Sequence, residues 1–130
     1  MLPYLSTPVV TISYAEAGYV RLDWQPYAAS AAELQALYEQ VLQAMRRHGV
    51  TALLSVHKQR PPLSPDVQAW LTTQWIPRAV ADAGYQRCAI VEADMPLGRL
   101  AARAVGLALT TPLRFRYFPS EAEAEAWLLS

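Results

Sequence analysis

Cysteine and lysine are scarce in this chain of 130 residues. Cys88 is the only cysteine, and Lys58 is the only lysine among eleven basic residues. One cysteine excludes an intramolecular disulfide and a zinc site built from several cysteines. Cys88 lies in the apolar run 88–91, which predicts a buried structural thiol. The excess of arginine and the abundant alanine indicate a coding bias, as in GC-rich bacterial genomes, rather than a function.

An excess charge of either sign is also missing. Eleven basic and eleven acidic residues give a formal net charge of zero, which argues against a general nucleic-acid binder. No apolar run approaches the roughly 20 residues of a membrane span. We also expect no signal peptide, because no N-terminal segment combines a charged start with an apolar stretch. We therefore expect a cytoplasmic protein. With 53% apolar and 17% charged residues, the chain is expected to fold as one domain over residues 1–130.

Motifs that hold cofactors or metals are not found either. The chain has no Gly-x-Gly-x-x-Gly, no phosphate-binding P-loop and no Gly-x-Ser-x-Gly. Its two histidines, His48 and His57, are far apart in the sequence, and His48 suits the end of a helix because of its charge. We expect no cofactor and no metal site.

Alternating strands and helices are the main pattern that is present. Residues 1–8 contain two prolines and are expected to form an extended lead-in. Val9–Tyr14 and Tyr19–Trp24 alternate in polarity around a turn that ends in glycine, which predicts an antiparallel hairpin. The remaining predicted elements are a helix from the Ser30 cap to His48, a strand 50–56, a helix from the Ser64 cap to Gly84 kinked at Pro77, a strand 87–93, a helix from Pro96 to about residue 108, a strand 113–118 and a helix 120–130.

This order predicts the α/β class. We expect a five-stranded mixed sheet, with one antiparallel hairpin strand followed by four βα turns with right-handed crossovers. For the helix that begins at Pro96, the expected inward face is Leu97, Leu100, Ala101, Ala104, Val105 and Ala108. Gly98, Ala102 and Gly106 form a smooth face at a spacing of four, which indicates either tight packing on a neighbour or a docking groove for a partner.

The element order and the stretch Ala69–Ala79, followed by Ala83-Gly84 and the strand residues Cys88–Val91, resemble the STAS family of anti-sigma-factor antagonists. The resemblance is closer to the small bacterial proteins described as STAS-like or CRAL-TRIO-like. It covers nearly all of residues 9–129. It implies a STAS-like fold and regulation through protein contacts.

Regulatory STAS proteins carry a phosphorylatable Ser or Thr in an Asp-x-Ser-Gly-like motif at the start of the second helix. The corresponding residues here are Leu63-Ser64-Pro65-Asp66, which lack the glycine. Ser64 is the only hydroxyl in that position, and it is also well placed to cap the helix. Phosphorylation of Ser64 and a purely structural cap are the two alternatives.

Polar side chains follow two predicted parallel strands, at the edge of the sheet where α/β proteins bind ligands. His57, Lys58 and Arg60 follow the first strand, and Glu92 and Asp94 follow the second. A histidine beside a carboxylate can act as a general base. The alternative is a polar rim, in which Lys58 and Arg60 pair with these acids or face solvent.

Aromatic residues suggest a ligand or partner surface, because a small domain hides four tryptophans with difficulty. The candidates are Trp24, Tyr27, Trp70 and Trp75. Trp70 and Trp75 differ by about 140° on an α-helix, so one of them can face outward. A second surface, an anion patch, would form if four arginines met on the third helix and the last strand. These are Arg99, Arg103, Arg114 and Arg116.

Three functions remain open from the sequence. The first is a non-enzymatic binding or regulatory module that acts through protein contacts, with another protein or as a homodimer. The second is a carrier of an apolar small molecule or lipid, with a cavity of several hundred Å³ near the tryptophans. The third is an enzyme that uses His57 with Glu92 or Asp94.

Overall fold

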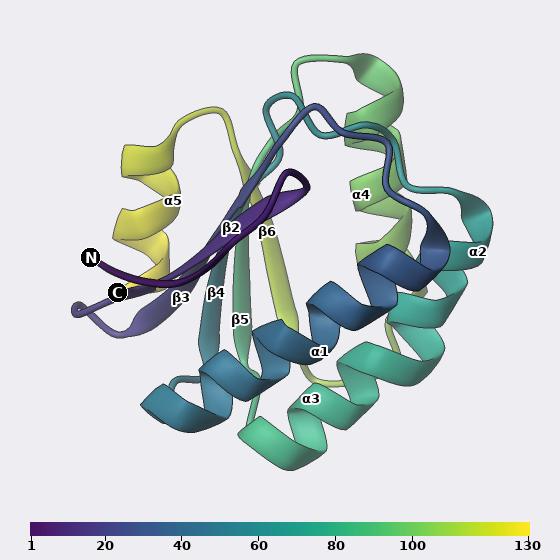
Figure 1. Cartoon of the computed structure of the whole chain (residues 1–130). Coiled ribbons are helices and arrows are strands. Elements are labelled where there is room, and N and C mark those ends of the chain that lie inside the picture. The colour runs from purple at the N-terminus through teal and green to yellow at the C-terminus, as the bar shows by residue number, and fades with distance from the viewer.

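The computed structural model describes residues 1–130 and shows a mixed sheet with helices on both faces (Figure 1). In chain order the elements are β1 (Leu2–Ser6), β2 (Val10–Ala15), β3 (Tyr19–Trp24), α1 (Ala31–His48), β4 (Ala52–Val56), α2 (Pro65–Trp70), the π-helical turn η1 (Leu71–Trp75), α3 (Ile76–Ala83), β5 (Arg87–Val91), α4 (Pro96–Ala108), β6 (Arg114–Phe118) and α5 (Glu121–Leu128). The predicted α/β class and mixed sheet are confirmed.

The sheet has six strands in the order β1-β2-β3-β4-β5-β6. β1, β2 and β3 are antiparallel, and β3 to β6 are parallel. The prediction of five strands was wrong because residues 1–8 were taken as a lead-in. Despite Pro3, Leu2–Ser6 pairs with β2 through an irregular register between Pro3 and Leu5, and it forms an edge strand, where a proline is tolerated.

Two apolar layers enclose the sheet. Helices α1, α2–η1–α3 and α4 cover one face with the larger core, and α5 alone covers the other (Figure 1). Three right-handed crossovers that advance in one direction place their helices on the same face, as the sequence of βα turns predicts. The cap of α1 forms as expected: Ser30 and Glu33 make the reciprocal capping box, and Gly49 ends the helix with φ 62°.

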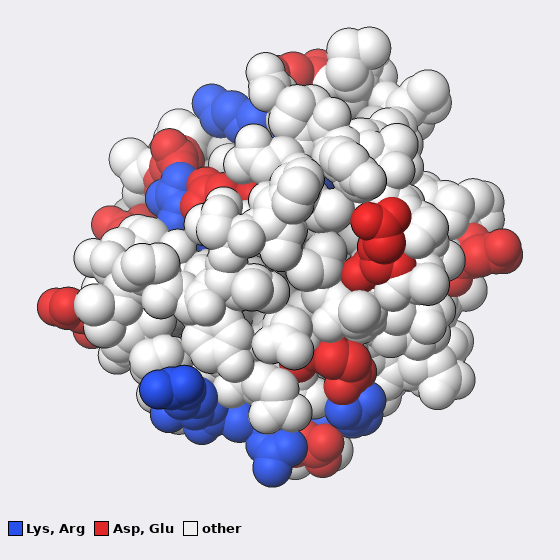
Figure 2. Space-filling model, viewed as in Figure 1, with Lys and Arg blue, Asp and Glu red and all other residues white.

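The charges on the face shown in Figure 2 are dispersed, in keeping with the net charge of zero. Basic groups at the lower left lie over the C-terminal end of α1, whose last turn contains Arg46 and Arg47. Cations stabilise that end of a helix because of its dipole. None of the helices has both the length and the apolar character that a membrane crossing requires.

Pro77 was expected to kink its helix, and the structure instead has a π-helical turn directly before it. Proline has no N–H, so the regular bond to Thr73 cannot form. The chain accommodates this one residue earlier, where the N–H of Ile76 donates to the carbonyl of Leu71, five residues back. The extra residue in this turn rotates Trp75 toward the side on which Trp70 lies.

The orientation of α4 differs from the prediction. Its buried residues are Gly98, Ala101, Ala102 and Val105. A Cβ atom at Gly98 would lie 2.8 Å from the Cβ of Ala93, and one at Gly106 would overlap the Tyr117 hydroxyl. The smooth face therefore packs tightly on the sheet, which supports the first of its two interpretations. Of the predicted inward face, Ala101 and Val105 are buried as expected, but Leu97, Leu100, Ala104 and Ala108 are exposed, because the glycines face inward.

Candidate functional site

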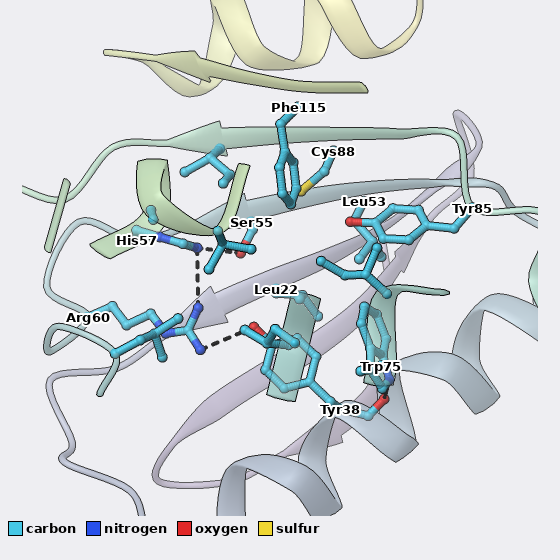
Figure 3. Close-up of a pocket in the computed structure, with 16 residues that line it drawn as sticks. Leu22, Tyr38, Leu53, Ser55, His57, Arg60, Trp75, Tyr85, Cys88 and Phe115 are labelled. Carbon is cyan, nitrogen blue, oxygen red and sulfur yellow. Dashed lines mark hydrogen bonds between the residues drawn. The ribbon is translucent and has the colours of Figure 1, made fainter. Parts of the chain in front are cut away.

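The carboxyl ends of β3, β4 and β5 lie side by side and support most of the candidate residues. Trp24 is the last residue of β3, His57 follows β4, and Glu92 follows β5. The loop after β4 turns back at once, since the N–H of Arg60 donates to the carbonyl of His57. This turn folds Arg60 over the ends of the strands and points its guanidinium toward His57 and Tyr38 (Figure 3).

The pairing that the enzyme hypothesis requires is absent. His57 makes no hydrogen bond or ion pair with Glu92 or Asp94. Glu92 instead binds the guanidinium of Arg103 on α4, at 2.7 Å and 3.0 Å. The loops after β4 and β5 are joined through backbone, where the N–H of Asp94 donates to the carbonyl of Lys58. Lys58 itself is exposed and forms no ion pair.

His57 is part of a buried polar network on its own side of the sheet (Figure 3). The indole N–H of Trp24 donates to Ser55 Oγ at 2.9 Å, and Ser55 Oγ lies 2.8 Å from His57 Nε2. Arg60 donates from Nη1 to His57 Nε2 at 3.3 Å and from Nη2 to the Tyr38 hydroxyl at 3.2 Å. A guanidinium can only donate, so Nε2 is an acceptor and the neutral ring carries its proton on Nδ1.

The charge state of His57 follows from its surroundings. Burial lowers the pKa of His57 well below 6.5, and the positive charge of Arg60 lowers it further. The imidazole is therefore neutral at pH 7. Ser55 and His57 form a close hydroxyl–imidazole pair, but no carboxylate orients the ring as in a serine hydrolase. The Ser55–His57 pair therefore lacks the third member of a catalytic triad.

Arg60 is the feature that the sequence did not reveal. It was expected to pair with an acid or to face solvent, but its exposed fraction is 7% and no carboxylate contacts it. Its guanidinium carbon lies 3.5 Å above the centre of the Trp24 ring. Trp24 and Arg60 are far apart in sequence, and only the pairing of β3 with β4 brings them together.

Two hollows adjoin Arg60. The inner cavity, about 40 Å³ in volume, lies between the sheet and the helices and is lined mainly by apolar side chains. The outer cleft, about 130 Å³, lies between the loop after β3 and the segment from Arg60 to Val67. Arg60 and Leu63 line both hollows. Neither of these two volumes reaches the several hundred Å³ that a lipid carrier needs. An open surface hollow of about 450 Å³ beside Trp70 and Trp75 does reach that size, and half of its eight lining residues are polar.

The four aromatic candidates do not form one exposed surface. Trp24 and Trp75 are buried, Trp70 is half-buried, and Tyr27 is exposed. Trp70 and Trp75 both pack on Tyr38, with ring centres 6.1 Å and 4.9 Å away. The π-helical turn explains why neither tryptophan faces fully outward. Tyr27 and Trp24 line the outer cleft.

Ser64 caps α2, since its hydroxyl accepts from the N–H of Val67 at 3.3 Å. We expect Ser64→Asp to keep the free energy of unfolding nearly unchanged and Ser64→Ala to lower it by about 1 kcal/mol, because aspartate caps as well as serine and alanine does not cap. Urea denaturation of the three proteins measures this difference. An equal loss in both variants would contradict the capping role.

Cys88 is buried and free, as the sequence predicts. Burial raises the pKa of its thiol to about 12, so the thiol stays protonated and unreactive in the folded protein. No group of three or more His, Cys, Asp or Glu side chains is arranged to hold a metal ion. Comparisons of the chain with models of protein families, with curated proteins and with solved structures find no match.

Proposed function

We propose that the protein is a non-enzymatic binding module that acts through protein contacts, and that α4 is its docking element. The observation that carries this proposal is a row of exposed apolar residues on α4. Leu97, Leu100 and Leu107 have exposed fractions of 68%, 63% and 89%, and Ala104 is exposed between them. These four residues are termed the α4 stripe. Contiguous exposed apolar residues of this kind are typical of interaction sites.

The spacing of the α4 stripe suits a helical partner. Its residues follow one another at intervals of three, four and three, which is the a/d pattern of paired helices. The stripe is also fixed in place, because Gly98 must face Ala93 in the loop after β5 and Gly106 must face Tyr117 of β6. A rotation of α4 that buried the leucines would therefore need a different contact between helix and sheet.

Charge around the α4 stripe favours an acidic partner. Arg103 on α4 shares one surface hollow with Leu107, Arg114 and Arg116. Arg103 pairs with Glu92, whereas Arg99, also on α4, donates only to the backbone carbonyls of Ala93 and Asp94 and has no carboxylate partner. The guanidinium groups of Arg114 and Arg116 lie over the ring of Trp127, on the face of the sheet that α5 covers. If two copies of α4 paired in antiparallel fashion, the positively charged Arg103 side chains of the two copies would lie close together and repel each other. An amphipathic helix with glutamates beside its leucines would complement this surface.

The regulatory role suggested by the STAS-like resemblance is part of this proposal. Phosphorylation of Ser64 would add negative charge at the start of α2, which packs against α4. A phosphoserine there would provide a means of regulating partner binding at the α4 surface.

The double substitution Leu100→Glu/Leu107→Glu tests the α4 stripe. The probe is a fluorescent amphipathic helical peptide with leucines at a and d positions and glutamates at the flanking positions. The peptide is expected to bind the wild-type protein and to bind the double variant at least about tenfold more weakly, because charge replaces apolar contact. Fluorescence anisotropy measures both affinities. Both substituted residues are exposed, so the free energy of unfolding should change by no more than about 0.5 kcal/mol each.

Two controls test whether the partner must be acidic and whether it binds at α4. The same peptide with lysines in place of the glutamates should bind much more weakly, and Glu33→Gln on α1, away from α4, should leave binding unchanged. Equal affinity for both peptides would contradict the acidic partner. A concentration-dependent dimer, seen by analytical ultracentrifugation and lost in the double variant, would assign the stripe to a second copy of the chain instead.

A further inference from the structure

β6 is the last strand of the sheet, and one of its two edges has no neighbour. It pairs only with β5, in parallel. The N–H of Arg114 donates to the residue before β5, and the carbonyl of Phe118 accepts from the residue after it. Since alternate residues of a strand bond to the same neighbour, the backbone N–H and C=O groups of Phe115 and Tyr117 point away from β5. We call this side of β6 the free edge, and no hydrogen bond within the protein reaches its backbone groups.

The opposite edge of the sheet is protected in a way that the free edge of β6 is not. β1 contains Pro3 and pairs with β2 through an irregular register, and both features discourage the addition of another strand. β6 contains neither proline nor glycine, and its register with β5 runs from Arg114 to Phe118 without a shift. Of the two edges, β6 therefore offers the regular template for a further strand.

A surface hollow of about 530 Å³ follows the free edge. Phe115 and Tyr117, whose side chains face α4, line this hollow. Arg114 and Arg116, whose side chains face α5, line it as well. Residues from both faces of a strand line one hollow only where the hollow runs along the edge of that strand. β6 lies between α4 and α5, and Leu107 of α4 adds an apolar wall (Figure 1).

The free edge is positively charged, and the protein does not balance this charge itself. Arg114 and Arg116 are exposed, and neither forms an ion pair. The three glutamates of α5, the helix on their side of the sheet, bond to other side chains; they are Glu121, Glu123 and Glu125. Both arginines are therefore available to the acidic groups of a partner.

The same charge argues against a second copy of the chain at this edge. If two β6 strands paired in antiparallel fashion, the arginines of both copies would lie beside one another on one face of the joined sheet. Like charges on neighbouring strands are destabilising. Arg114 and Arg116 thus oppose self-association and favour a strand of opposite charge.

We propose that the free edge of β6 binds an extended acidic segment of a partner protein, which joins the sheet as an added strand. Acidic side chains at alternate positions of the segment lie beside Arg114 and Arg116. The apolar side chains between them pack against Phe115 and Tyr117, on the side of α4. Backbone hydrogen bonds supply affinity and the side chains supply selectivity. This inference goes beyond docking at the α4 stripe, because its test uses a different peptide and different variants, so that either proposal can fail alone.

A short blocked peptide in which glutamate and valine alternate tests the added strand. With a fluorescent label, it should bind the wild-type protein saturably in an anisotropy titration. N-methylation removes a backbone N–H. In an antiparallel pair the valine N–H groups would face Phe115 and Tyr117, and in a parallel pair the glutamate N–H groups would face β6. Methylation of one set should weaken binding by at least about tenfold, and methylation of the other should leave it unchanged.

Either direction of the peptide supports the proposal, since only one set of N–H groups then matters. Equal affinities of the two methylated peptides would show that the peptide does not add as a strand, and would overturn the proposal. Absence of saturable binding would overturn it as well.

The double substitution Arg114→Ser/Arg116→Ser tests the charge of the free edge. It should weaken binding of the unmethylated peptide by at least about tenfold. Arg46→Ser/Arg47→Ser is the matched control: these arginines are also exposed, but they lie at the end of α1 and remove the same charge, so binding should not change. Equal losses in the two double variants would indicate general charge attraction and would contradict a site at β6.

Hydrogen exchange in the unaltered protein gives an independent readout. The amide protons of Phe115 and Tyr117 should exchange more slowly in the peptide complex, because they gain bonding partners there. The amide of Arg114 already donates toward β5, so its exchange should change less. NMR spectroscopy in D2O measures these rates one residue at a time. Unchanged exchange at Phe115 and Tyr117 in the saturated complex would place the peptide elsewhere and overturn the proposal.

Discussion

Replacement of Trp75 by alanine is expected to lower the free energy of unfolding by about 3–5 kcal/mol. The ring is 2% exposed and packs edge-on against Tyr38 and Tyr85, with ring centres 4.9 Å and 5.9 Å away. Its indole N–H donates to the carbonyl of Tyr38 at 2.8 Å. The substitution therefore creates a cavity beside an existing one and removes the indole hydrogen bond to a carbonyl inside α1. Urea denaturation followed by circular dichroism measures the loss.

Two variants separate the causes of this loss. Trp75→Phe keeps most of the ring and removes the donor, so it should cost about 1–2 kcal/mol. Trp70→Ala is the matched control on the same helix, and it should cost about half as much as Trp75→Ala or less, because Trp70 is only half-buried. Equal losses at Trp70 and Trp75 would contradict the packing described for the π-helical turn.

The behaviour of these two tryptophans shows where sequence patterns are sufficient and where they are not. The cap at Ser64 and the disturbance at Pro77 were predictable, since each depends on neighbours within four residues. The form of the disturbance was not, because proline can be accommodated by a kink or by a π-helical turn. Only the turn places both Trp70 and Trp75 on Tyr38.

The orientation of helix α4 is a second feature that the sequence pattern did not predict. Its leucines suggested the inward face, since leucine is commonly buried. The sheet surface under α4 instead carries Phe115 and Tyr117, whose rings occupy the space that larger side chains of the helix would need. Gly98, Ala102 and Gly106 were recognised as a smooth face, but the sequence could not show that this face and the buried face were the same. The exposed leucines follow from that contact.

The position of the candidate site in the fold was predictable from the sequence, but the contacts that its side chains make were not. The order of strands and helices put His57 and Arg60 at the ligand-binding edge of the sheet, and the structure has them there. Their contacts depend on Ser55, Trp24 and Tyr38, which come from three separate elements. Side chains that lie on different elements have no spacing signal in the sequence.

Acidification below about pH 6.5 is expected to destabilise the protein through His57. In the unfolded chain the pKa of histidine is about 6.5, whereas burial and, to a smaller extent, Arg60 hold the pKa of His57 well below that value in the folded protein. Below pH 6.5 the unfolded state therefore binds a proton that the folded state does not. Stability is fully present above this pH and falls by up to about 1.4 kcal/mol per pH unit, until the pH reaches the folded-state pKa.

The contribution of His57 is isolated by His57→Gln, whose amide oxygen can still accept a hydrogen bond from Arg60. Urea denaturation from pH 7.5 to 5 measures the unfolding free energy of the wild type and of this variant. As the pH falls, the wild type should lose stability relative to the variant, because only the wild type has His57. His48→Gln is the control, because His48 is stacked on Tyr14 at the end of α1, outside the network. In Arg60→Met the slope should persist, since burial is the larger cause, but it should level off at a higher pH, because the folded-state pKa of His57 is less depressed without Arg60. Equal pH slopes in the wild type and His57→Gln would show that His57 is not the buried neutral acceptor of this network.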